Sequence, residues 1–567
     1  MLATCSSNYV SVDKARTQKS RHHLQPFYGQ KRTIMTGLCG ALLSLSVTQA
    51  VRAQDVAGAM VPAIREEGLK RSGAYGYVSA LADGIGARLS GSANMDRAYD
   101  WAMKSLRDIG LKNVHLEDTG MRAIQWRQNR AWVAMTTPDQ MVFLAQAGAW
   151  SVSTKGPIEG DITAVELNDE ADLERLRGTL RGKIVLLGPL RDTPMMDRAM
   201  AVRYTDEQVA QGIPNHPVRQ ALSTAKARIP QQIKAGLFKE KLRKFLEAEG
   251  VGAVILPSRE SEHGGGSGNL SIDEGPFSVR SWNPDERPHF PFAYVAIENF
   301  GRAWRLAKAG RDVKLALDLD IQEGPVKPAY NVVADLPGTD PKAAAQMVLA
   351  GAHLDSWASG TGALDNASGV ASVIEAVRIL KAIGLRPRRT IRLVLFGAEE
   401  QGLYGSQAYV RDHLGVIPRS AAPDQMALPV ETRRVQLGPL KTRPDYRNFS
   451  IIYNMDAGSG RVRGVYAGGN PRLASIFRGW IEPLKDLGVT QVFDEPFYPA
   501  DQSTFTEIGL PGVMFLHDPL EYFTRARHSN LDTMERISRE DIAQVSTVLA
   551  IFLAQSAMAD GVLPRNR

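Results

Sequence analysis

The sequence predicts an α/β fold in which helices sandwich a mostly parallel mixed sheet. From Tyr330 onward, short apolar runs alternate with helical patterns, as in consecutive βα units. Three of these runs are followed closely by imidazole or carboxylate residues: His353, Glu399 and Asp456. Ligands of such sheets bind outside the carboxyl ends of the strands, so these polar residues mark a candidate site.

The individual elements of this region follow from hydrophobic periodicity. The helix expected at 368–383 carries Val370, Val373, Ile374 and Val377 on one face. We predict strands at 330–335, 347–352, 390–396, 449–454 and 513–516, and further helices at 402–412, 471–486 and 538–556. We expect parallel alternation to the end of the chain, with 416–447 as a long surface loop.

The 567 residues are too many for a single core, so two or three domains are expected. Residues 61–110 look helical, with a turn and a candidate N-cap at Leu89–Ser92. From about Arg122 to Glu323 a separate module is predicted. Its strands are expected at 183–187, 252–256, 293–296 and 313–319, preceded by short ones at 114–116, 131–135 and 141–144, and its helices at 169–180, 233–248 and 298–309.

The first 53 residues have the three-part form of a secretory signal. Lys31 and Arg32 precede an apolar run at 37–47, and small residues allow cleavage after Ala53. The part before the apolar run is long for a signal, so translation starting at Met35 stays open, as does an uncleaved anchor. We expect a secreted or periplasmic protein without stable membrane insertion.

Charge and cysteine content exclude several classes of function. Residues 1–53 hold seven basic residues and one acid, so they carry +6 of the formal charge of +7. The nearly neutral body argues against a nucleic-acid partner, which needs a basic surface. Both cysteines, Cys5 and Cys39, lie in the same leading segment, so a metal in the body must use His, Asp and Glu.

The loop from Gly351 to Gly369 joins a predicted strand to a predicted helix. It carries His353, Asp355, Asp365 and Asn366, and its glycines allow tight turns. Further acidic or imidazole residues follow later strands: Glu399, Glu400, Asp456 and His528. Gathered at one sheet edge, these acids would repel each other and lose hydration, a cost that a bound cation removes.

Imidazole and carboxylate ligands suit zinc, and two ions fit if one carboxylate bridges them. Two Zn²⁺ with three carboxylates leave one positive charge, which favours a hydroxide between the ions. A neighbouring carboxylate, for which Glu399 fits, is then free to take the proton. Asp355 can hold the second ring nitrogen of His353, and Asp532, four residues after His528, can do the same there.

Five motifs in this order carry a resemblance: HLDSW, GALDNASG, FGAEEQGLYGS, NMDAG and RHSNLDT. They resemble the co-catalytic zinc exopeptidase family of aminopeptidases and glutamate carboxypeptidases, with details leaning toward its carboxypeptidase Q-like branch. The resemblance implies the zinc exopeptidase fold, with peptidase segments at 54–122 and 326–567. Residues 123–325 then form an inserted protease-associated-like α+β domain.

The resemblance also implies roles for particular residues. Asp365 becomes the bridging ligand of two Zn²⁺, Glu399 the general acid/base, and Asp355 the residue that orients the first histidine. The terminal ligands become His353, Glu400, Asp456 and His528. The family motif often has a second histidine directly before the last ligand, where this chain has Arg527.

Less specific interpretations stand beside these roles. Glu399 and Glu400 could instead be an acid pair at a helix N-terminus. Tyr522 or Tyr498 could give a hydroxyl to the oxyanion, and His517 is expected to be structural. A solvated loop is expected to hold Arg433, Arg434, Lys441 and Arg443, and His263, in a glycine-rich loop, is expected to be exposed.

The resulting hypothesis is a zinc exopeptidase that hydrolyses short peptides by a bridging hydroxide with Glu399 as base. The inserted module would form a wall or lid that limits access. An aminopeptidase for longer peptides, a single-zinc cyclising acyltransferase and a receptor that has lost catalysis stay open. The sequence gives neither side-chain preference nor oligomeric state, so a homodimer also stays open.

Overall fold

Four buried strands form the centre of the sheet, and each is a short apolar run that is hidden on both faces. They are β9 (Met347–His353), β10 (Thr390–Phe396), β13 (Phe449–Asn454) and β16 (Gly512–His517). The order β16-β13-β9-β10 is parallel throughout, as continuous Val, Ile and Leu runs favour. These four strands confirm the predicted ranges to within one residue at each end.

The computed structural model describes residues 58–565 except 194, 196–198, 214–216, 259–267, 429–432, 434 and 497–498. The predicted signal segment, with Cys5 and Cys39, therefore lies outside the described residues. So do His263, Arg434 and Tyr498.

The prediction that every strand of this half is parallel is wrong. The strand β8 (Lys314–Leu336) is antiparallel to β10, and β14 (Val462–Tyr466) is antiparallel to β16. The outer strand β15 (Gln491–Phe493) then pairs with β14 in parallel. The sequence did not reveal β14 because Arg463 and Gly464 interrupt its apolar pattern.

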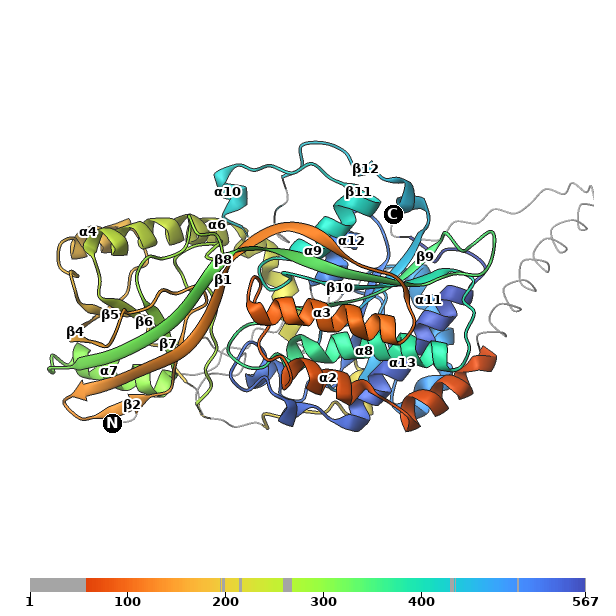
Figure 1. Cartoon of the computed structure of the whole chain (residues 1–567), viewed down its shortest axis with the longest axis horizontal. Helices are drawn as coiled ribbons and strands as arrows, with labels where there is room; N and C mark the ends of the chain where they lie inside the picture. The colour runs from red at the N-terminus through yellow and green to blue at the C-terminus, as the bar shows by residue number, and fades with distance from the viewer. Residues whose placement is uncertain are drawn as a thin grey trace, which may run out of the picture. The chain divides into compact units, whose positions relative to one another are not determined.

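A long antiparallel ribbon of β1 (Lys112–Thr137) and β8 runs through the chain, and it is drawn in orange and green in Figure 1. It merges the short strands predicted at 114–116 and 131–135, because polar residues between 125 and 130 hide the strand pattern there. The predicted domain boundaries at 122/123 and 325/326 fall inside this ribbon, and they stay predictions.

The segment between the two ribbon strands builds the other end of the sheet. Its parallel strands are β4 (Ile158–Val165), β5 (Ile184–Leu187), β6 (Ala253–Pro257) and β7 (Phe292–Val295), and β3 (Ala145–Ala147) closes the edge in antiparallel fashion. The short β2 (Met141–Phe143) pairs with β1. The main helices here are α4 (Glu170–Leu176), α5 (Asp206–Ala210), α6 (Pro217–Glu249) and α7 (Ile297–Lys308). Separate apolar cores thus form on this part of the sheet.

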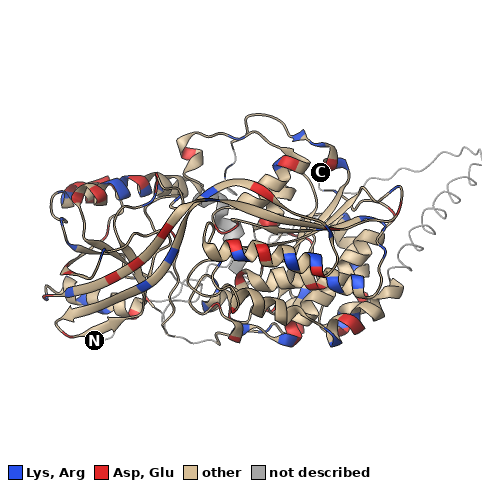
Figure 2. Cartoon of the chain, viewed as in Figure 1, with Lys and Arg blue, Asp and Glu red and all other residues tan. Residues whose placement is uncertain are grey.

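The helix α3 (Ala93–Asp108) begins where the sequence predicted a cap. The Ser92 hydroxyl accepts a hydrogen bond from the Met95 N–H, which satisfies one of the helix's first amides. Met95, Ala98 and Ala102 are buried, whereas acidic and basic residues are interspersed along its outer face (Figure 2). Residues 58–70 and α2 (Ala74–Ala82) complete the leading helical segment.

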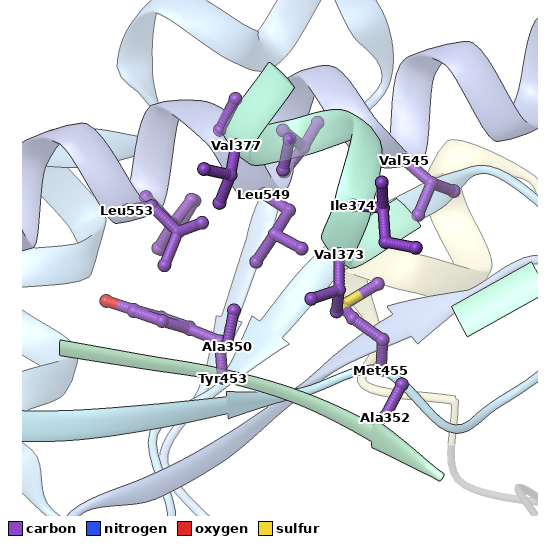
Figure 3. Packing of buried hydrophobic residues seen from close by; sticks show 14 of the residues in the cluster. Ala350, Ala352, Val373, Ile374, Val377, Tyr453, Met455, Val545, Leu549 and Leu553 are labelled. Carbon is purple, nitrogen blue, oxygen red and sulfur yellow. The ribbon is translucent and has the colours of Figure 1, made fainter. Parts of the chain in front are cut away.

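Two helices cover the central strands and carry the largest apolar core. Val373, Ile374 and Val377 of α8 (Ser368–Ala382) pack beside Leu549 and Leu553 of α13 (Arg539–Met558) (Figure 3). Among the described residues, α13 is the one helix long and apolar enough to cross a membrane. However, 94% of its apolar window is buried inside the protein, as in a core helix.

Shorter elements complete the half of the fold that contains β9, β10, β13 and β16. They are α9 (Tyr404–Tyr409), α10 (Pro423–Met426), α11 (Pro471–Trp480), α12 (Asp501–Thr506) and the two short strands β11 (Gly415–Val416) and β12 (Lys441–Thr442). The predicted helix at 471–486 ends as an α-helix at Trp480 and continues as a 3₁₀ turn. The predicted loop at 416–447 holds α10, β12, a 3₁₀ turn at Pro444–Arg447 and a β-bridge between Arg419 and Gln436, and the rest of its described residues are irregular.

Truncation of Leu549 to alanine is expected to destabilise the protein by about 2–5 kcal/mol, because the side chain is fully buried and a cavity would form. Urea unfolding followed by circular dichroism measures the change. The matched control is Leu437→Ala, since that leucine is 68% exposed and its loss should change stability by no more than about 0.5 kcal/mol. Equal effects of the two substitutions would contradict this account of the core.

Candidate metal centre

The predicted ligand residues come from four neighbouring strand ends. His353 is the last residue of β9, Glu400 follows β10, and Asp456 follows β13. His528 lies beyond β16, two residues after the end of a π-helical turn at Tyr522–Ala526. Because β10, β9, β13 and β16 are adjacent and parallel, their carboxyl ends meet at one edge.

Asp365 lies between the two imidazoles. Its Oδ1 is 3.1 Å from His353 Nε2, and its Oδ2 is 3.1 Å from His528 Nε2. Asp456 Oδ1 is 3.6 Å from His353 Nε2, and Glu400 Oε2 is 3.1 Å from His528 Nε2. The arrangement therefore has two halves, each with one imidazole and one acid, which share the carboxylate of Asp365.

Several of these atoms are close to one another without forming hydrogen bonds. Asp365 Oδ2, Glu400 Oε1 and His528 Nε2 are buried and have no hydrogen-bond partner among the described residues. Donor atoms of His353, Asp365 and Glu400 all lie within 4.8 Å of one another. Orphaned nitrogen and oxygen atoms that converge in this way fit a divalent cation, since a cation satisfies all of them together.

Burial and mutual repulsion shift the pKa values of the site residues. Burial first, and then the carboxylates of Asp456 and Glu400, raise the pKa of Glu399 well above its ordinary value. Burial would lower the pKa of His353, but nearby carboxylates, those of Glu399 and Asp456 foremost, raise it well above its ordinary value. The raised pKa favours the protonated imidazole of His353, and a bound metal would compete with that proton.

Asp355 braces the site in a way that the sequence predicted only in part. The His353 Nδ1 lies 3.1 Å from the Asp355 carbonyl oxygen, which accepts its hydrogen bond, whereas the carboxylate lies 3.7 Å away. The carboxylate instead accepts from the backbone N–H groups of Glu399 and Glu400 at 3.1 and 3.2 Å. One buried residue therefore fixes both the imidazole and the loop with the two glutamates.

Asp532 does not hold the second nitrogen of His528, so that prediction is wrong. Its carboxylate accepts from the backbone N–H groups of Leu364 and Asp365, at 2.6 and 3.2 Å. A spacing of four residues brings side chains together in a helix, but residues 528–532 form turns. Burial, and next the Asp365 charge, raise the pKa of Asp532 to about 7. Asp532 therefore positions the shared carboxylate.

Substitution of Asp532 by asparagine is expected to weaken zinc binding about 10–100-fold, because the amide nitrogen cannot accept from a backbone N–H. Zinc titration against a competing chelator measures the affinity. Activity should return at high zinc, since no ligand is lost. Asp486→Asn is the control, because that side chain is 63% exposed and pairs with Arg65 rather than with a residue of the site. Unchanged zinc affinity in Asp532→Asn would contradict the positioning role.

Sequence reasoning missed two buried charged residues beside the centre. The Arg88 guanidinium donates to the carbonyls of Leu354, Thr361 and Gly362, and so holds the loop between β9 and Asp365. Asp501, at the start of α12, is buried near His353, and burial raises its pKa to about 7. Arg88 lies in the ARLSGS stretch that only predicted a helix cap, and Asp501 follows no predicted strand.

Two glycines of the loop allow close packing. A Cβ at Gly369 would lie 2.2 Å from the Met455 carbonyl oxygen, and one at Gly360 would lie 2.6 Å from the Ser529 carbonyl oxygen. Both glycines are needed for close approach, whereas the tight turn that the sequence predicted occurs at Gly362, with φ of 65°.

The structure assigns different places to the remaining residues that the sequence suggested. Tyr522 is buried against Gly458 beside the ligand carboxylates, whereas Tyr498 lies outside the described residues. His517 is structural, as expected, because its Nδ1 bonds the Gly460 carbonyl oxygen. The alternative of a helix N-terminal acid pair is wrong, since the next helix, α9, begins only at Tyr404.

Comparisons with known proteins agree with this geometry. Residues 331–553 match the family described as Peptidase family M28. Carboxypeptidase Q of Rattus norvegicus is 26% identical over 515 residues, which cover 90% of this chain and 91% of the relative. Carboxypeptidase Q of Homo sapiens is likewise 26% identical over 514 residues, with 90% and 91% covered.

Solved structures share the fold. The crystal structure of a peptidase M28 precursor from Shewanella amazonensis SB2B superposes with a TM-score of 0.61 at 23% identity, covering 91% of this chain and all of that one. A zinc aminopeptidase from Bacillus subtilis gives a TM-score of 0.50 at 18% identity, with 84% and 92% covered. At these identities the likeness concerns the fold alone.

The fold and the sheet-edge cluster, with these relatives, define a metallo-exopeptidase, which is a hydrolase. Residues 331–553 match peptidase family M28, the family of co-catalytic zinc exopeptidases, and the chain is similar over nearly its whole length to carboxypeptidase Q. The resemblance drawn from the five motifs and the predicted α/β fold with a mostly parallel mixed sheet are thereby confirmed, whereas the inserted protease-associated-like domain stays a prediction.

Proposed function

We propose that this chain hydrolyses short peptides with two zinc ions that share the carboxylate of Asp365. The observation that carries the proposal is the contact of each Asp365 oxygen, at 3.1 Å, with a different imidazole. A carboxylate that turns one oxygen to each half can serve both halves. Hydrogen bonding alone would not leave His528 Nε2 orphaned beside it.

The remaining ligands divide between the two halves. His353 and Asp456 would hold one zinc, and Glu400 and His528 would hold the other. Three carboxylates offset three of the four positive charges, so one remains. Zinc bound in such a site polarises a carbonyl group and lowers the pKa of water.

Glu399 is proposed to move the proton. It precedes a ligand residue, and Asp355 fixes its backbone N–H. Burial raises the pKa of its carboxyl well above the ordinary value, which suits a group that must accept a proton and later give it to the leaving amine. The hydroxyl of Tyr522, near Asp365 and Asp456, is a candidate hydrogen-bond donor to the carbonyl oxygen of the substrate.

The inserted segment is proposed to form a wall that limits substrates to short peptides. The Ser271 hydroxyl donates to the His528 carbonyl at 2.7 Å, and Ser271 also forms a β-bridge with Ser529. Farther along, Val202 forms a β-bridge with Leu520, and Arg203 pairs with the buried Asp518 at 3.2 Å. These contacts support a wall that reaches the ligand loop. Export, with cleavage after Ala53, is part of the same proposal.

Dipeptides blocked separately at each end test the proposed function. The zinc-loaded protein should cleave a free dipeptide, and a chelator should abolish the activity until zinc is restored. Loss on blocking either end indicates a dipeptidase, whereas loss on blocking only the amino end indicates an aminopeptidase. Failure to cleave any peptide with zinc bound, or cleavage that persists after zinc removal, would overturn the proposal.

A further inference from the structure

The two ligand imidazoles are held in different ways. The Nδ1 of His353 donates to the Asp355 carbonyl oxygen at 3.1 Å, which fixes that ring. Within the described residues, the polar contacts of the His528 ring run through its Nε2 alone, and the ring packs edge-on against Trp357 with the two centroids 6.2 Å apart. Histidines that bind metals are usually fixed through the second ring nitrogen, so the orientation of His528 must have another source.

The backbone at His528 has an unusual conformation. Its φ is 56°, in the left-handed region that residues other than glycine rarely adopt. Its carbonyl oxygen accepts two hydroxyl hydrogen bonds, from Ser271 Oγ at 2.7 Å and from Ser359 Oγ at 2.9 Å. A strained backbone of this kind persists only where the surrounding contacts enforce it. The two hydroxyls therefore help to fix the direction in which the imidazole leaves the backbone.

One of these hydroxyls belongs to the inserted segment, which contacts the ligand loop on both sides of the histidine. The Leu270 N–H donates to Asn530 Oδ1 at 2.8 Å, and the Leu270 carbonyl oxygen accepts from the Asn530 N–H at 2.9 Å. The Asn269 Nδ2 donates to the Arg525 carbonyl oxygen at 2.5 Å. These three hydrogen bonds hold the loop before and after His528.

The residues of this contact are shielded from solvent. Asn269 is 3% exposed, Ser271 is 5% exposed and Ser359 is 7% exposed. A buried acceptor that loses its donor has little water to replace it, so the loss of one hydroxyl leaves the His528 carbonyl oxygen underpaired. The backbone at the ligand would then be free to relax away from its strained conformation.

We infer that Ser271 is a positioning residue for the zinc half that contains His528. Together with Ser359, it holds the left-handed backbone and so directs the His528 Nε2 toward the carboxylate of Asp365. The inserted segment thereby contributes to one zinc half, whereas the other half is held through Asp355. The inference rests on the proposed function, since it assigns one zinc ion to each half. Zinc binding and the contacts of the inserted segment then stabilise each other.

The test adds Ser271→Ala to two variants that each weaken one zinc half, and zinc affinity is measured by titration against a competing chelator. In Asp456→Ala the tighter remaining zinc lies beside His528, and its affinity should fall about 10-fold, at the low end of what the loss of an outer-shell partner causes. In Glu400→Gln the tighter remaining zinc lies beside His353, and its affinity should not change. A general loss of stability would not distinguish the two halves.

Two further serines complete the comparison. Ser359→Ala removes the other hydroxyl from the same carbonyl oxygen, so it should give the same selective loss and keeps the test decisive if Ser271→Ala does not fold. Ser153→Ala is the matched control, because its hydroxyl donates to the Ile321 carbonyl oxygen at 3.0 Å within the inserted part of the sheet. It should leave the zinc affinity of both halves unchanged.

Amide hydrogen exchange gives a readout that is independent of catalysis. The Asn530 N–H donates to the inserted segment, so zinc should slow its exchange in the wild type, and it should do so less in Ser271→Ala. Exchange at Asn530 that does not respond to zinc would overturn the inference. So would equal affinity losses in the two zinc halves, no loss beside His528, or an equal loss from Ser153→Ala. A wild type that binds fewer than two zinc ions would instead contradict the proposed function.

Discussion

Glu399→Gln is expected to bind zinc as the wild type does and to lose about 10²–10⁴-fold in kcat. The amide has nearly the shape of the carboxyl group but cannot take up a proton. None of the short contacts around His353 and His528 involves Glu399, so the ligand set stays complete. Steady-state kinetics on a free dipeptide, together with zinc analysis of the same sample, measures both quantities.

The adjacent acid provides the control for this experiment. Glu400→Gln removes a carboxylate that lies 3.1 Å from His528 Nε2, so it should lower zinc content as well as activity. Two neighbouring glutamates would thus give different outcomes from the same chemical change. Undiminished turnover in Glu399→Gln, or zinc loss equal to that of Glu400→Gln, would contradict the role of Glu399 as proton acceptor.

Asp365→Ala is expected to have the largest effect on metal binding. Its carboxylate faces both imidazoles, so its removal takes a ligand from both proposed zinc ions together. The affinity for each should fall by more than the roughly 100-fold typical of losing an outer-shell partner, and hydrolysis should stop. Metal analysis after dialysis against a defined free zinc concentration measures the loss.

The matched variant for Asp365→Ala is Asp456→Ala. Of the two ligand imidazoles, Asp456 is paired with that of His353, at 3.6 Å, so its removal should weaken one zinc and leave the other in place. Similar zinc contents in the two variants, or retention of both ions in Asp365→Ala, would show that the carboxylate is not shared.

The positions of the candidate ligands could be predicted because they follow strands that are recognisable in the sequence. The runs 390–396 and 449–454 are continuous apolar segments, and the structure has strands at the same residues. Adjacent parallel strands end at one edge, so residues placed after them converge. The strand pattern alone therefore predicts that His353, Glu400 and Asp456 lie close together, and the loop conformations are not needed for this prediction.

The rest of the prediction was limited by loop conformations and by strands whose middle residues are polar. The partner of Asp532 depends on how residues 528–532 turn, and spacing alone does not give that turn. The ribbon of β1 and β8 has polar residues in the middle of both strands, so its period-two pattern is lost there. Arg88 contacts residues of the loop after β9 that lie 266–274 positions away in the sequence. Local sequence patterns do not predict contacts at such separations.

Anomalous diffraction at the zinc edge, from crystals of the zinc-loaded protein, tests the shared carboxylate most directly. The account predicts two peaks about 3.5–4 Å apart. One should lie beside His353 and Asp456 and the other beside His528 and Glu400, with Asp365 between them. A single peak with Asp365 bound on one side only would contradict the account and would favour a single-zinc enzyme.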